Sequence, residues 1–148
     1  MDTIRLRPAT ADDADLLLKL RNDSDTRRSS FETGEVQKKE HISWLARVLA
    51  AEDRQLLVAE EDGVLVGTVR ADLSGGVYEL SWTVSPDARG RGVGKCIVAL
   101  TAAQILEPIR AKIKSDNISS VRIAEHAGMA FEREVNGVLH YSRPAQQL

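Results

Sequence analysis

The chain has 148 residues, 43% of them hydrophobic, with a single cysteine and a formal net charge of −2 at pH 7. This composition predicts one globular domain over residues 1–148, and the lack of surplus positive charge disfavours nucleic acid as a ligand. One cysteine excludes an internal disulfide. Because no apolar run reaches membrane-spanning length and no signal peptide is visible, we expect a cytoplasmic protein without a membrane partner.

The first third of the chain predicts one strand, two helices and a loop. Residues 4–7 alternate between apolar and polar side chains, as in a strand. Residues 10–22 predict a helix capped by Thr10, and residues 37–51 predict a second helix with apolar residues at helical spacing. The polar residues 23–35 between these helices show no periodicity, so we expect a long loop there.

The middle of the chain predicts a strand meander, a helix and one further strand. Residues 55–60, 64–73 and 77–84 read as strands separated by glycine turns, which predicts an antiparallel meander. The almost wholly apolar residues 93–106 predict a helix packed on the sheet. Residues 109–114 predict a strand parallel to the third strand of the meander, because the chain returns to the sheet through a helix.

The last part of the chain predicts a short helix and a hairpin. Residues 117–127 form the helix, with Gly128 as its left-handed cap. Asn136-Gly137 predicts a tight hairpin turn, which pairs residues 130–135 with residues 138–143. Residues 144–148 are expected to be a tail.

The connection between the third strand of the meander and the following helix contains three alternating glycines, Gly90, Gly92 and Gly94. Glycine permits positive φ and lets a ligand approach the backbone closely. The helix that follows presents unpaired N–H groups and the positive end of its dipole to the loop. This arrangement suits a di- or triphosphate, with ordinary turn chemistry as the alternative.

Two familiar phosphate motifs are excluded by spacing. A Walker loop would need glycine and a hydroxyl residue where the chain has Arg89 and Cys96. A dinucleotide fingerprint would need glycine or alanine at Lys95. Cys96 is expected to be a packed thiol, and the histidines have no metal-ligand spacing with it, so no metal is implied.

The order Arg-x-x-Gly-x-Gly in residues 89–94 resembles the pyrophosphate loop of the GNAT N-acetyltransferases, which bind acetyl-coenzyme A (acetyl-CoA). The order of the predicted elements resembles that family as well. The resemblance implies an α/β (α+β) fold with a mixed, mostly antiparallel sheet, a central parallel strand pair and about four flanking helices. It also implies that the cofactor contacts Trp82, Thr83, Val84, Arg89, Gly90, Arg91, Gly92, Val93, Gly94, Lys95 and Asn117.

The resemblance further implies the chemistry. An ammonium group must lose its proton before it attacks a thioester, and Glu79 stands where many family members carry the base. An exposed strand carboxylate is the alternative. Many members have a tyrosine as general acid where this chain has Ala124, so Tyr141 is the candidate substitute. Two alternatives stay open: Tyr141 has only a packing role, or the thiolate leaves without a general acid.

Residues 20–23 and 40–45 resemble the GNAT branch that acetylates nucleotide-linked amino sugars, as in pseudaminic acid biosynthesis. We therefore expect a small-molecule amine, an amino sugar linked to a nucleotide. The residues expected to bind it are Arg21, Asn22, Arg27, Arg28 and Trp44, with core packing as the alternative for Trp44. A peptide N-terminus and an aminoglycoside are alternative acceptors. A non-catalytic acyl-CoA-binding module is the alternative function, and a homodimer is compatible with either.

Overall fold

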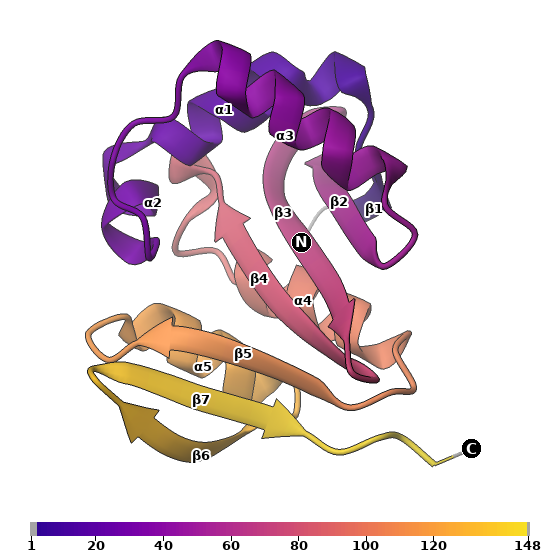
Figure 1. The fold of residues 1–148 in the computed structure, drawn as a ribbon, viewed down its shortest axis with the longest axis vertical. Helices are drawn as coiled ribbons and strands as arrows, with labels where there is room; N and C mark the ends of the chain where they lie inside the picture. Colours follow the sequence, from indigo (N-terminus) through magenta and orange to yellow (C-terminus); the bar gives the residue numbers. More distant parts are fainter. Residues whose placement is uncertain (1–2, 148) are drawn as a thin grey trace.

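Residues 3–147, the part of the chain that the computed structural model describes, form a seven-stranded sheet flanked by helices (Figure 1). The strand order is β1-β2-β3-β4-β5-β7-β6. The strands are β1 (Ile4–Pro8), β2 (Arg54–Glu61), β3 (Val64–Ser74), β4 (Val77–Val84), β5 (Ile109–Lys114), β6 (Ala130–Val135) and β7 (Val138–Arg143). The helices are α1 (Ala14–Asn22), α2 (Ser24–Ser29), α3 (Lys38–Ala50), α4 (Val93–Ala103) and α5 (Ile118–His126), with short 3₁₀ turns at Ala11–Asp13 and Pro86–Ala88.

The sheet is mixed, as predicted. Strands β4 and β5 are parallel, and the other neighbouring strands pair antiparallel. The predicted meander of β2, β3 and β4 is confirmed. The hairpin of β6 and β7 is confirmed as well, with positive φ at Asn136 (51°) and Gly137 (78°), as a tight turn of this kind requires.

Helices cover the sheet unevenly. Helices α4 and α5 pack on one face, where Ile97, Val98 and Ile123 join the main apolar core. Helices α1 and α3 pack on the other face of the first strands, against a second core that includes Val58. In Figure 1 no helix crosses the near face of β5 and β7, while α5 lies behind them. None of the helices within residues 3–147 combines the length and apolar character needed to cross a membrane.

The structure differs from the prediction within residues 23–35, because α2 occupies Ser24–Ser29. Asp23 caps this helix, since its carboxylate accepts a hydrogen bond from the Thr26 N–H (3.1 Å). A six-residue helix is too short to show an apolar period in the sequence. Its stability depends on contacts made after folding, which is why the segment reads as a loop.

The end of α4 and the tail also differ from the prediction. Helix α4 ends at Ala103 rather than at residue 106. The Gln146 side chain donates to the carbonyls of Ala102 (3.1 Å) and Ile105 (2.8 Å), which also accept from the Arg143 guanidinium (2.8 Å each). The segment 144–147 is therefore attached to α4, and residue 148 lies outside the described residues.

Candidate functional site

The loop between β4 and α4 has the backbone geometry of an anion site. Gly90 and Gly92 both have φ of 78°, in the left-handed region that side chains disfavour, and Gly92 is the N-cap of α4. A Cβ atom at Gly90 would meet nothing within 4 Å, so the loop faces open space there. The N–H groups of Val93, Gly94 and Lys95 have no helical partners, and together with the dipole they favour an anion.

Close packing places this loop beside the C-terminal end of β4. A Cβ atom at Gly94 would clash with the side chain of Ile123 on α5 and would lie 3.2 Å from Cγ2 of Val84. A Cβ atom at Gly67 on β3 would lie 2.8 Å from the carbonyl oxygen of Thr83. Only glycine permits both approaches without displacement, so the glycine loop and the end of β4 form one surface.

Strands β4 and β5 separate soon after they begin. Over the described chain their parallel register comprises two pairs, Tyr78 with Ile109 and Glu79 with Arg110. Figure 1 shows the two strands diverging toward their C-terminal ends. The backbone groups of residues 80–84 on that side face no neighbouring strand, and apart from the Val84 carbonyl, which accepts from Arg89 Nε, they are available to an extended ligand arm, as in strand addition. This stretch includes the three residues expected to hold pantetheine.

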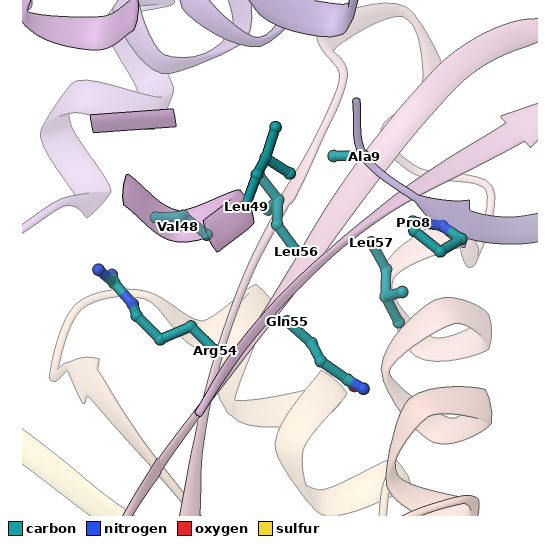
Figure 2. Close-up of a pocket in the computed structure, with 8 residues that line it drawn as sticks. All are labelled: Pro8, Ala9, Val48, Leu49, Arg54, Gln55, Leu56 and Leu57. Carbon is teal, nitrogen blue, oxygen red and sulfur yellow. The ribbon is translucent and has the colours of Figure 1, made fainter. Parts of the chain in front are cut away.

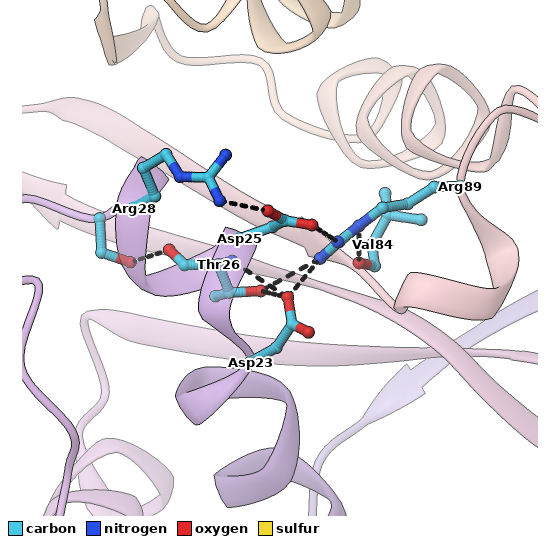
Figure 3. A network of polar contacts seen from close by, with 7 residues as sticks. Asp23, Asp25, Thr26, Arg28, Val84 and Arg89 are labelled. Carbon is cyan, nitrogen blue, oxygen red and sulfur yellow. Dashed lines mark hydrogen bonds and ion pairs between the residues drawn. The ribbon is translucent and has the colours of Figure 1, made fainter.

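Arg89 is turned toward α2 rather than toward the glycine loop (Figure 3). Its Nη2 donates to Asp23 Oδ2 (3.0 Å) and to Thr26 Oγ1 (3.3 Å), its Nη1 to Asp25 Oδ2 (3.1 Å), and its Nε to the Val84 carbonyl (3.1 Å). Burial alone would raise the pKa of Asp23, but hydrogen bonds from Arg89 and the Thr26 N–H outweigh it and lower the pKa. The guanidinium thus joins α2 to the end of β4.

The other two cations of the loop differ in their partners. Arg91 donates from Nη1 to Glu61 Oε1 (3.1 Å) at the end of β2. Lys95 is exposed in the first turn of α4 and makes no ion pair or hydrogen bond to any side chain of residues 3–147. Lys95 is therefore the loop cation that is most available to a phosphate.

Asn117 and Trp82 meet at the start of α5. Asn117 caps this helix, because its Oδ1 accepts from the Ser120 N–H (3.2 Å). The Trp82 indole N–H donates to the Ser120 hydroxyl oxygen (3.2 Å), which attaches α5 to the open part of β4. Both residues lie beside the strand end that carries the glycine loop. A contact between Asn117 and a cofactor stays a prediction, since its side chain already has a local role.

Glu79 lies beside two cations. Its Oε1 accepts from Arg110 Nε (3.2 Å) and lies 3.6 Å from Lys112 Nζ. Its side chain is 35% exposed, and within the described residues Oε2 has no hydrogen-bond partner, so an amine or a water can reach it. The carboxylate is located where β4 and β5 begin to separate. This geometry is compatible with a base, and equally with a structural ion pair.

Tyr141 lies on the opposite face of the sheet from Glu79. It pairs with Ala111 in the β5–β7 register, and successive side chains of β5 alternate between the two faces. Tyr141 is 5% exposed and packs edge-on against Phe131. Burial, and secondarily the charge of Glu125, raise the pKa of its hydroxyl. The structure therefore does not bring the two candidate catalytic side chains together.

Arg21 and Asn22, expected to bind the acceptor, hold the segment after α2. Arg21 Nη2 donates to the Glu32 carbonyl (2.8 Å). The Asn22 side-chain amide donates to the Val36 carbonyl (2.9 Å) and accepts from the Val36 N–H (2.8 Å). These bonds close the loop between α2 and α3, so both residues have structural roles.

Arg27 and Arg28, expected near the phosphates of an acceptor, are paired with groups of their own segment. Arg27 donates to the Thr33 carbonyl (3.0 Å) and to Glu35 Oε1 (3.5 Å). Arg28 forms an ion pair with Asp25 (2.8 Å), which Figure 3 shows beside Arg89. Both pairs are largely exposed, so they are weak and a phosphate can compete for them.

Trp44, on α3, is half-buried and packs against the second apolar core. Its ring stacks on His41 with a centroid distance of 5.6 Å, and the Arg70 guanidinium lies 5.6 Å from its centroid. Burial lowers the pKa of His41. Of the described side-chain atoms, Arg21 Nη1, His41 Nε2 and Glu61 Oε2 are buried without a hydrogen-bond partner. Packing accounts for Trp44, and the burial of the two nitrogens keeps them from solvent.

Sequence reasoning missed Arg110 and Lys112, which contact Glu79. Residues 109–114 alternate strictly, with apolar residues facing α4 and α5 and basic residues on the other face. Since this strand was predicted to lie parallel to the Glu79 strand, the alternation already placed three basic side chains near that carboxylate. The period-two pattern was the available signal.

Two hollows lie outside the glycine loop. One, of about 210 Å³, lies between the end of α3 and strands β1 and β2 (Figure 2). Of the described residues that line it, most are apolar and none is a carboxylate, histidine or cysteine, so it offers no catalytic group. The other, of about 490 Å³, lies over β5 and β7 and includes Arg110, Lys112 and His140. Within residues 3–147 no cluster of histidine, cysteine, aspartate and glutamate is placed to hold a metal ion.

Several solved structures with this fold are described as acetyltransferases. The spermidine N-acetyltransferase from Vibrio cholerae, in complex with CoA and spermine, has a TM-score of 0.84 at 18% identity over 95% of this chain and 94% of that one. The aminoglycoside acetyltransferase AAC(6')-Ib, in complex with paromomycin and acetyl-CoA, has a TM-score of 0.83 at 19% sequence identity. The match covers 98% of this chain and 94% of that one. Ribosomal-protein-alanine N-acetyltransferase from Brucella melitensis has a TM-score of 0.79 at 22% sequence identity. The match covers 95% of this chain and 99% of that one. At these identities the likeness establishes the fold, and it confirms the predicted architecture.

Family membership follows from the sequence match. None of the curated proteins matches the chain in sequence. The family model described as "Acetyltransferase (GNAT) domain" matches residues 3–130, which is most of the chain. The prediction of an acetyltransferase is thereby confirmed at the level of the family. The chain belongs to the GNAT acetyltransferase family.

Proposed function

We propose that the chain transfers acetyl from acetyl-CoA to a primary amine of a small molecule, and that this amine belongs to a nucleotide-linked amino sugar. One observation carries the acetyl-CoA assignment: the glycine loop at the start of α4 adjoins the stretch of β4 that has separated from β5. The loop suits a pyrophosphate and the unpaired strand suits an extended amide-bearing arm. Coenzyme A has both parts.

The glycine loop and β4 bind different parts of coenzyme A. Backbone N–H groups of residues 90–95 bind the pyrophosphate, and Lys95 adds charge. Backbone groups of residues 82–84 bind the pantetheine arm. Arg89 contributes indirectly, because its contacts hold α2 against the end of β4. We retain Asn117 as a neighbour of the cofactor, beside the β4 end.

Glu79 is the proposed base. An amine arriving where β4 and β5 separate meets the free Oε2 atom, directly or through a water, and gives up its proton there. The neutral amine then attacks the thioester carbonyl. The coenzyme A thiol has a low enough pKa to leave as thiolate without a side-chain acid. This accommodates Ala124, and the buried position of Tyr141.

The residues expected to bind the acceptor favour a polar, anionic small molecule. Arg27 and Arg28 lie in weak exposed pairs with Glu35 and Asp25, with which a phosphate can compete. A peptide N-terminus and an aminoglycoside are the rival acceptors, since structural neighbours are described with spermine and paromomycin. The expected compartment is the cytoplasm, and a homodimer is the expected assembly to test.

A second function has a specific observation in its favour. The Glu79 carboxylate already lies against Arg110 and Lys112, and Tyr141 is buried, so a module that binds acyl-CoA without turnover fits the same geometry. Release of free thiol from acetyl-CoA, measured over a panel of amines, separates the two. Acetyl transfer predicts thiol release that depends on the amine. Saturable binding of acetyl-CoA without release of free thiol for any amine would support the non-catalytic binding module instead.

A further inference from the structure

A row of basic side chains crosses the open face of the C-terminal strands. Lys112 on β5 pairs in register with His140 on β7, and His140 pairs with Arg133 on β6. Arg110 precedes Lys112 by two residues and therefore shares its face. These four residues are called the basic row below. In Figure 1 no helix crosses this face of β5 and β7.

The basic row concentrates positive charge on one face of the sheet. Arg110 and Lys112 on β5 and Arg133 on β6 bring three cations to this face, with His140 between Lys112 and Arg133. Among residues 3–147, Glu79 contacts Arg110 and Lys112, Glu132 contacts Arg133 (3.3 Å), and Asp72, the registered partner of Glu79 on β3, pairs with Arg54 and Arg70. These carboxylates leave a positive surplus, although the whole chain carries a net charge of −2. Overall basicity therefore does not explain the row.

The basic row lines a hollow of ligand size. All four of its residues line the hollow over β5 and β7, together with Ser142 and with Glu132, whose carboxylate pairs with Arg133. Its volume of about 490 Å³ lies within the usual range for small-molecule sites, roughly 300–1,000 Å³. The lining offers guanidinium, ammonium and imidazole groups, which are the side chains that bind phosphate oxygens.

The hollow lies next to the proposed base and away from the glycine loop. Arg110 is the registered partner of Glu79. Val84, where the glycine loop approaches β4, is five residues farther along the strand, or roughly 17 Å. A ligand anion on the basic row is thus separate from the pyrophosphate of coenzyme A, while its amine can extend to Glu79.

We propose that the basic row is an anion subsite that binds the phosphate groups of the acceptor while the acceptor's amine lies at Glu79. This inference rests on the proposed acetyl transfer and specifies its substrate class: an amine that carries a phosphate or diphosphate. A polycationic amine would be repelled by the row. The subsite gives the phosphates a second place, in addition to the exposed pairs of Arg27 and Arg28.

The test is a calorimetric titration of inorganic pyrophosphate into protein saturated with CoA, so that the glycine loop is already filled. Wild type should bind pyrophosphate. Lys112→Gln and Arg133→Gln should each weaken this binding about tenfold, the loss of one charge-assisted hydrogen bond. Arg5→Gln is the matched control, because it removes one exposed cation from β1 at the opposite edge of the sheet. It should leave binding unchanged.

Several results would overturn the subsite: no pyrophosphate binding to the CoA-saturated protein, equal affinity in all variants, or equal weakening in Arg5→Gln. Circular dichroism checks that each variant is folded. A kinetic arm separates this failure from failure of the proposed function. Pyrophosphate binding lost in the variants but no acetyl transfer to any amine would keep the subsite and remove the activity. Acetyl transfer with the same KM for a phosphorylated amine in wild type and Lys112→Gln would keep the activity and remove the subsite.

Discussion

Gly90→Ala and Gly76→Ala form a matched pair that tests the glycine loop. Gly90 has φ of 78° and Gly76 has φ of 79°, and at both positions a Cβ atom would meet nothing within 4 Å. Each substitution therefore imposes the same left-handed strain and no clash. That strain costs about 1 kcal/mol, which corresponds to a fall in melting temperature of about 4 °C for a chain of this size.

The two variants should differ in their affinity for acetyl-CoA. Gly76 lies in the turn between β3 and β4, whereas Gly90 lies in the loop that we propose binds pyrophosphate. Relief of strain at residue 90 moves the loop N–H groups out of alignment, and the new methyl group points into the space in front of the loop. Loss of one hydrogen bond to a charged phosphate weakens binding roughly tenfold or more.

The assays are urea unfolding for stability and isothermal calorimetry for acetyl-CoA affinity. We expect equal destabilisation in the two variants, and weaker binding in Gly90→Ala alone. Equal acetyl-CoA affinity in both variants would refute the assignment of residues 90–95 as the pyrophosphate site. Unequal destabilisation would show that the strain argument itself is wrong.

Three further changes test other parts of the account. Glu79→Gln should lower turnover about 10²-fold with unchanged acetyl-CoA affinity; an unaltered rate across the pH range would leave Glu79 as a structural partner of its neighbouring cations. Tyr141→Phe should retain activity in the thiol-release assay, because the hydroxyl is buried on the face opposite Glu79; a tenfold loss would restore its role as general acid. Asp13→Asn tests acid stability: a hydrogen bond from Arg7 lowers the pKa of Asp13 below its ordinary 3.8, so its contribution is present above that value and is lost as pH falls through the folded pKa. The variant should be less stable than wild type by about 1 kcal/mol near pH 6, with a smaller difference near pH 3 by urea unfolding; a constant difference would contradict the pairing.

The meander, the parallel pair and the final hairpin were predictable because their information is local. Asn136-Gly137 fixes a turn type, and the strand, helix, strand order around the glycine loop dictates a parallel pair. The loop itself was predictable for the same reason, since positive φ at Gly90 and Gly92 follows from the requirement for glycine.

The side-chain partners of the site were not predictable, because they come from distant segments. Arg89 was expected at the phosphates, yet its guanidinium pairs with Asp23 and Asp25, more than sixty residues earlier in the chain. The same contacts help to fix α2, which the sequence pattern reads as a loop. Asn22 similarly closes the segment before α3. Spacing alone gives no information on which of several nearby acids and cations will pair.

The basic row was predictable only in part. Its alternation in β5 is visible in the sequence, and the hairpin register that brings His140 beside Lys112 follows from the turn and the strand pairing. The sequence does not reveal that this face is uncovered. In Figure 1 no helix of residues 3–147 lies over it, so the row is available to a ligand. The parallel pairing of β4 with β5, which brings the row to Glu79, was predictable from the order of elements.

The most direct test of the account is a competition among three acceptors under saturating acetyl-CoA: a nucleotide-linked amino sugar, an aminoglycoside and a short peptide. The measured quantity is kcat/KM for acetyl transfer to each. The account predicts that the nucleotide-linked amino sugar is preferred at least tenfold, which is about 1.4 kcal/mol in transition-state binding. A tenfold preference for the aminoglycoside or the peptide would contradict the proposed acceptor while leaving the chain an acetyltransferase.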